Sequence, residues 1–184
     1  MLAAIAQFAL PGIVGVVGES YYARNAFPAF YAPSSVISVL PRGYGASILV
    51  NVVASGIALQ TLATQVSMAR NKYKEKAAKD GDADAEARFS YPKLYAEGFS
   101  QHAKEFNCVQ RGHQQALETY PVFLAASLIA SIRFPLLSTV AGLLWIVARF
   151  KWAQGYATGE PSKRYDNFLS KGVWIALIIQ LVGA

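Results

Sequence analysis

The stretch Phe106–Pro121, FNCVQRGHQQALETYP, decides the fold because it joins a polar stripe to a long apolar segment. Its polar residues recur at spacings that place them on one face of an α-helix: Asn107, Arg111, Gln115 and Glu118. The fourteen residues that follow Glu118 carry no charge. A helix of this kind belongs in a membrane or in a large buried core. An ionised Arg and Glu at its polar end therefore indicate a functional site.

The composition favours a membrane protein. Hydrophobic residues make up 54% of the 184 residues and charged residues only 15%, whereas a soluble chain carries roughly 25% charged residues. The net charge of +6 does not come with a basic patch interleaved with aromatic residues, so we expect no nucleic-acid partner. The Lys and Arg residues flank apolar spans instead, which fits lipid head groups or an acidic small ligand.

Apolar runs and turn residues predict an all-α, integral membrane four-helix bundle over residues 43–184. The expected helices cover Gly43–Ala69, Lys104–Ile132, Leu136–Tyr156 and Phe168–Ala184. Pro135 should end one helix and begin the next, because proline disfavours helix in the residue before it. A single cysteine, Cys108, excludes an internal disulfide. Two isolated histidines make a metal site an unfavoured interpretation, so we predict none.

Two basic connections set the expected orientation. The first is the polar section 70–105, whose insert 75–90 is rich in Ala, Gly and charge and reads as a solvated or frayed helical loop. The second is 149–171, whose first residues also form the polar extension of the predicted helix through Tyr156. The positive-inside rule puts both in the cytoplasm or an equivalent compartment. Trp145 is expected to face lipid or the membrane interface.

Residues 1–42 form an extra hydrophobic N-terminal arm outside the bundle. Its Gly12, Gly15 and Gly18 make a small-residue ridge of the kind that lets membrane helices pack closely. Pro11 argues against one smooth helix. We therefore expect a half-span that packs against a partner in the membrane, followed by residues 25–41 lying along the interface.

Two stretches resemble the membrane glutathione transferases of the MAPEG superfamily. They are FNCVQRGHQQALETYP and, after a turn and an apolar span, ARFKWAQGYATGEPSKR at residues 148–164. The similarity covers residues 44–171 and is greatest to the type 3 branch of the microsomal glutathione S-transferases. It implies a homotrimer that holds glutathione, its co-substrate, between subunits near the cytoplasmic face. It also implies a lipophilic second substrate delivered from the bilayer.

The resemblance also assigns residues to the glutathione site. Arg164 is implied as the cation that stabilises the thiolate, with Lys163 as the neighbouring alternative because the loop is one residue longer here. The other implied contacts are Arg70 (from the adjacent subunit), Arg111, Gln115, Glu118, Trp152, Gln154 and Tyr156. Their chemistry suits glutathione, whose carboxylates need arginine and whose ammonium needs an acid. Trp152 and Gln115 depart from the Tyr and Asn usual in the family.

Two functions remain open from the sequence. The first is a membrane glutathione transferase or peroxidase acting on lipophilic electrophiles or lipid hydroperoxides. The alternative is a non-catalytic accessory subunit of a larger membrane complex, joined to other subunits through residues 1–40. Either protein could lie in the endoplasmic reticulum or a mitochondrial membrane.

Overall fold

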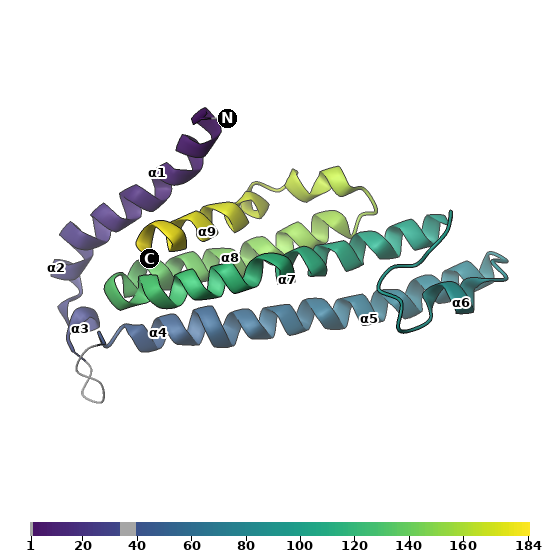
Figure 1. Ribbon diagram of the computed structural model, residues 1–184, viewed down its shortest axis with the longest axis horizontal. Helices are drawn as coiled ribbons and strands as arrows, with labels where there is room; N and C mark the ends of the chain where they lie inside the picture. The colour runs from purple at the N-terminus through teal and green to yellow at the C-terminus, as the bar shows by residue number, and fades with distance from the viewer. Residues whose placement is uncertain (1, 34–39) are drawn as a thin grey trace.

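The computed structural model describes residues 2–33 and 40–184, with side chains from residue 10 onward. The described part is a bundle of long helices without a regular strand (Figure 1). Three helices are long and apolar enough to cross a membrane: Tyr44–Lys79, Gln101–Arg133 and Pro135–Tyr156. A shorter apolar helix, Phe168–Gly183, completes the bundle. The prediction of an all-α membrane helical bundle is therefore confirmed.

The helices begin and end where the sequence supplies the signals. The first rod is continuous through α4 (Tyr44–Ile48), η2 (Leu49–Ala54) and α5 (Ser55–Lys79), and it is followed by the short α6 (Ala85–Phe89). Helix α7 (Gln101–Arg133) starts at Ser100, whose side chain accepts a hydrogen bond from the Ala103 N–H. Helix α8 (Pro135–Tyr156) starts directly at its proline. The 3-10 turns η3 (Pro161–Tyr165) and η4 (Phe168–Lys171) then lead into α9 (Gly172–Gly183).

The centre of the bundle is aromatic. Trp145 of α8 is fully buried and stacks on Phe123 of α7 with ring centroids 4.5 Å apart. Tyr120 packs beside both rings and shares a hydrogen bond with Ser55 of α5. The prediction that Trp145 faces lipid is wrong, because its ring fills the space between α7 and α8 that smaller side chains would leave empty.

A buried polar network ties three helices and η2 together. The Asn51 amide donates to Ser138, and the Ser138 hydroxyl donates to Gln180 of α9. The Gln180 amide in turn donates to the Ser138 carbonyl, 3.0 Å away. The Ser138 hydroxyl also lies within hydrogen-bond distance of the Ser127 carbonyl of α7. Gly142 makes room for Asn51, since a Cβ there would lie 2.1 Å from the Asn51 Oδ1. Close approach at small residues and interhelical hydrogen bonds hold membrane helices together.

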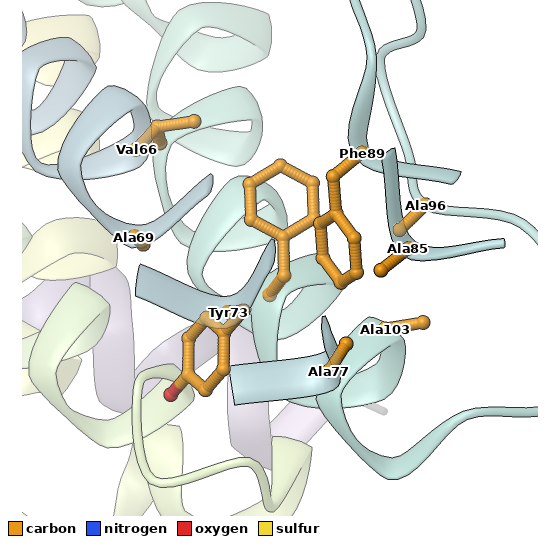
Figure 2. Packing of buried hydrophobic residues seen from close by; sticks show 9 residues of the cluster. Val66, Ala69, Tyr73, Ala77, Ala85, Phe89, Ala96 and Ala103 are labelled. Atoms are coloured by element: carbon orange, nitrogen blue, oxygen red, sulfur yellow. The ribbon is translucent and has the colours of Figure 1, made fainter. Parts of the chain in front are cut away.

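The charged insert 75–90 is packed rather than frayed, which corrects the sequence interpretation. Helix α5 runs to Lys79, and Ala77, Ala85 and Phe89 are buried in a cluster with residues of α5 and α7 (Figure 2). The Phe89 ring meets Phe106 edge to face, with centroids 5.7 Å apart. The insert orders because Ala77, Ala85 and Phe89 form an apolar face and Asp82 pairs with Arg88 at 3.1 Å.

The N-terminal arm is a continuous helix through α1 (Leu2–Gly18), η1 (Glu19–Ala23) and α2 (Arg24–Ala26), followed by α3 (Pro28–Tyr31). The expectation that Pro11 interrupts it is wrong. The arm crosses α9 (Figure 1), with Gly12 against Val182 and Gly15 against Leu137. Gly12 and Gly15 of the ridge therefore contact the same chain, whereas Gly18 has no neighbour within 4 Å, and docking of the arm on a partner stays a prediction. Of the segment expected along the interface, residues 34–39 lie outside the described residues.

Glu19 fastens the arm to the bundle. Its side chain is only 4% exposed and accepts hydrogen bonds from the backbone N–H groups of Leu137 (2.6 Å) and Leu136 (3.1 Å). These N–H groups belong to the first turn of α8, which has no side-chain cap of its own. The Tyr31 hydroxyl donates to the same carboxylate at 2.5 Å, and burial together with this bond raises the pKa of Tyr31.

Replacing this anchor should loosen the arm. Glu19→Ala leaves two N–H groups of α8 and the Tyr31 hydroxyl without their acceptor, at about 1–3 kcal/mol for each buried group. We expect a lower thermal midpoint in detergent and rapid proteolysis within residues 2–26. Asn25→Ala, which removes only an exposed bond to Tyr21, is the control. Equal protection of the arm in both variants would contradict this account.

Candidate functional site

A cavity lies where the N-terminal part of α7 meets the end of α8. Its volume is about 640 Å³. Its lining combines cationic, polar and aromatic groups: Lys104, Asn107, Cys108, Arg111, Tyr156 and Pro161, together with the 98–101 turn. A cavity of this size suits a small-molecule ligand, and its two cations favour an anionic one.

Arg164 packs against two residues of the cavity lining, Tyr156 and Pro161, because η3 folds back on α8. The backbones meet at Gly155, where a Cβ would lie 2.5 Å from both the Arg164 Cα and the Lys163 oxygen. The guanidinium lies over the rings of Tyr156 (5.4 Å) and Tyr165 (4.7 Å), and it donates to the Pro161 carbonyl. No ion pair among the described residues includes Arg164. Arg164 itself is not among the residues that line the cavity.

Lys163 differs from Arg164 in its ion pairing and in the direction of its side chain. Its ammonium pairs with Glu160 at 3.0 Å, and both side chains are about half exposed. Residues on successive positions of a 3-10 turn point in different directions. The structure thus places Arg164, and not Lys163, over the ring of Tyr156.

The four residues of the polar stripe of α7 have three different environments. Asn107 both donates to and accepts from the backbone of Ala96, at 2.8 Å in each case, so it anchors the loop before α7. Arg111 and Glu118 pair at 2.5 Å while remaining 39% and 46% exposed. Gln115, by contrast, is buried and turned into the bundle.

Gln115 accepts a hydrogen bond from Arg149, a residue that the sequence interpretation counted with the basic connection 149–171. Arg149 lies inside α8, is 1% exposed, and also donates to the Thr119 hydroxyl. Its guanidinium lies 4.9 Å from the Trp145 ring centroid, and its Nε has no acceptor among the described residues. The missed signal was an arginine at the end of an uncharged apolar run, since such a charge is costly inside a membrane unless it has a function.

A model of the MAPEG family matches residues 48–183. The chain belongs to the MAPEG family. This membership supports a role like that of the membrane glutathione transferases or in related eicosanoid and glutathione metabolism, and the family is generally associated with glutathione. The long apolar helices agree that this MAPEG protein is an integral membrane protein.

Of the residues predicted for the glutathione site of this MAPEG protein, only Arg111 and Tyr156 line the cavity, and Arg70, Gln154 and Trp152 are held in other surroundings. Arg70 is 4% exposed and donates to the carbonyls of residues 89, 93 and 94, which holds the loop after α6. Gln154 is exposed, accepts from Lys151, and lines a separate small cavity beside His113. Trp152 is buried against Tyr165, with its Nε1 unpartnered among the described residues.

The described part of this MAPEG chain contains no group of three or more His, Cys, Asp or Glu residues that could hold a metal ion. Cys108 lines the cavity as a buried thiol. The chemistry that the cavity offers is therefore cationic and aromatic, suited to an anionic ligand with a polarisable group.

The contact at Gly155 gives a direct test of the site's geometry. Alanine favours a helix over glycine by about 1 kcal/mol, but Gly155→Ala pushes a Cβ into the backbone of η3. We expect faster hydrogen exchange at residues 161–165 while the bundle stays protected. Gly56→Ala, where a Cβ meets nothing within 4 Å, should leave η3 unchanged. Equal exchange in the two variants would show that η3 does not depend on this contact.

Proposed function

We propose that this MAPEG protein is a membrane glutathione transferase or peroxidase that binds glutathione as co-substrate in the cavity between α7 and α8. The observation that carries the proposal is the guanidinium of Arg164, which lies over Tyr156 at the cavity rim without an acidic partner among the described residues. The relation to the type 3 branch belongs to the same proposal.

The other polar groups match the rest of the ligand. Glutathione carries two carboxylates and one ammonium. Arg111 and Lys104 line the cavity and suit the carboxylates. Glu118, which pairs with Arg111 in the unliganded chain, would take the ammonium and leave Arg111 free to turn toward a carboxylate. The bonds from Arg149 to Gln115 and Thr119 hold α8 against α7.

Arg164 acts by favouring the thiolate. A thiol with a pKa of about 8.5 is mostly protonated at neutral pH. A nearby guanidinium that lowers this pKa by about two units supplies roughly 2.7 kcal/mol of differential stabilisation. Arginine suits this role because it stays charged when partly dehydrated. The proton leaves to solvent at the open side of the cavity.

The bound thiolate can then follow one of two courses. With an electrophile, the sulfur forms a bond to carbon, and the displaced group or the added electron pair takes up a proton. With a lipid hydroperoxide, the sulfur attacks the outer oxygen and the O–O bond breaks. The alkoxide is protonated to an alcohol, and a second glutathione converts the sulfenic acid to glutathione disulfide and water. In both cases the bilayer would supply the lipophilic substrate.

The alternative function, an accessory subunit without catalysis, draws on a specific observation. The Arg70 guanidinium already donates to loop carbonyls, and the Arg111 guanidinium already pairs with Glu118. A homotrimer, also part of our proposal, would place Arg70 near a neighbouring subunit, and glutathione binding would then have to free it. Direct measurement of glutathione binding to the purified protein separates the two functions.

The thiolate assignment predicts a spectroscopic difference between neighbouring variants. At pH 7, bound glutathione should show ultraviolet thiolate absorbance in the wild-type protein. Arg164→Ala should lower the thiolate fraction about 20-fold, because the pKa returns toward about 8.5. Lys163→Ala should keep the signal, since that ammonium pairs with Glu160. The reverse pattern would transfer the role to Lys163.

Glu118 gives a second test that separates binding from folding. Glu118→Gln should weaken glutathione binding by roughly 1.5–3 kcal/mol, the range for a hydrogen bond to a charged group. Its effect on thermal stability should stay below about 1 kcal/mol, because the pair with Arg111 is half exposed. Calorimetric titration and thermal unfolding measure the two effects. A large loss of stability with normal affinity would make the pair structural and favour the accessory subunit.

A further inference from the structure

A second cavity lies at the opposite end of the spanning helices, where the arm meets the turn between α7 and α8. Its volume is about 190 Å³. Arg24 and Tyr31 of the arm line one side, and Arg133, with Ile132, lines the other; Leu40 and Pro41 border it. Because α7 ends at Arg133 and α8 begins at Pro135, this cavity lies at one end of two candidate membrane spans (Figure 1).

Two arginines of this cavity have no acidic partner in the part of the chain that the structure describes. Arg24 donates to the Arg133 carbonyl at 2.8 Å and lies 5.2 Å from the Tyr31 ring centroid. The Arg133 guanidinium lies 5.6 Å from the Phe134 ring centroid. Neither arginine forms an ion pair among residues 2–33 and 40–184. The one acid of residues 1–69, Glu19, already accepts from Leu136, Leu137 and Tyr31.

The surroundings of the cavity are those of a membrane interface. Ile132, at its edge, and Ile129, one turn earlier on α7, are about half exposed. Tyr21, Tyr22 and Phe27 of the arm are all more than half exposed. Aromatic residues of this kind gather at the level of lipid head groups. The cavity therefore combines arginines that lack an acidic partner among the described residues with an apolar strip that continues along α7.

We propose that this cavity binds the phosphate of an anionic phospholipid, with Arg24 and Arg133 as donors. Planar guanidinium groups suit phosphate oxygens, and basic pockets between membrane helices are typical sites for anionic head groups. The exposed Ile132 and Ile129 favour a lipid over free phosphate as the ligand, because the acyl chains of a lipid would cover these side chains and free phosphate would not. A lipid held by one arginine from the arm and one from the α7–α8 turn fastens the arm to the bundle.

The test uses the full-length protein, delipidated in detergent and titrated with phosphatidylglycerol or phosphatidylcholine under native mass spectrometry. We expect the wild-type protein to retain phosphatidylglycerol in preference to phosphatidylcholine. An arginine near a lipid surface contributes about 1 kcal/mol, roughly fivefold in affinity. Arg24→Gln with Arg133→Gln should therefore weaken phosphatidylglycerol binding at least about tenfold. Lys79→Gln with Lys171→Gln, the same change of charge at the other end, should leave it within about twofold.

Arg133→Gln alone keeps the arm docked, because the Arg24 bond goes to the backbone carbonyl of residue 133 and Glu19 is untouched. Arg133→Gln should weaken phosphatidylglycerol binding about fivefold. This single variant tests the proposal if the double variant does not fold. An unchanged affinity in Arg133→Gln, or equal losses in the arginine and lysine pairs, would overturn the proposal. Complete displacement of the lipid by millimolar inorganic phosphate would assign the cavity to a free anion and overturn it as well.

Discussion

Lipid offers no hydrogen-bond partners, so every polar group buried between these helices depends on another group of the protein. The chain meets this constraint at successive depths. Glu19 accepts from the first turn of α8 at one end, and Asn51, Ser138 and Gln180 satisfy one another further in. Each network joins different helices, so the set fixes their relative positions more specifically than apolar contact could.

Helix α8 is the element on which these networks converge. It carries Ser138 in the central network and Arg149 in the next layer, and its last turn carries Tyr156 at the candidate cavity. Gly155 then lets η3 close against it and brings Arg164 over Tyr156. The candidate site is therefore an extension of the packing of α8. A change in the packing of α8 should therefore alter the cavity before it alters the rest of the bundle.

Arg149 links the packing of α8 to a residue of the predicted site. Its charge is buried with hydrogen bonds to Gln115 and Thr119 but with no acid beside it among the described residues. Burial of an unpaired charge costs several kcal/mol. A protein that needed only a packed core would be more stable with an apolar side chain at this position. None of Arg149, Gln115 and Thr119 lines the cavity, so the retained charge is linked to the predicted site only through its bond to Gln115.

The sequence by itself determined the membrane class, the helices, the proline that separates α7 from α8, and the family resemblance. These follow from composition and from local signals such as Pro135, which act over a few residues. Tertiary structure alone decided which polar residues meet. It turned Gln115 toward Arg149, committed Arg70 to loop carbonyls, and placed Arg164 rather than Lys163 over Tyr156. It also packed the 75–90 insert and docked Gly12 and Gly15 of the arm on their own chain. Helical spacing says which residues share a face, but the partner of that face is set by the packing of helices that lie far apart in the sequence.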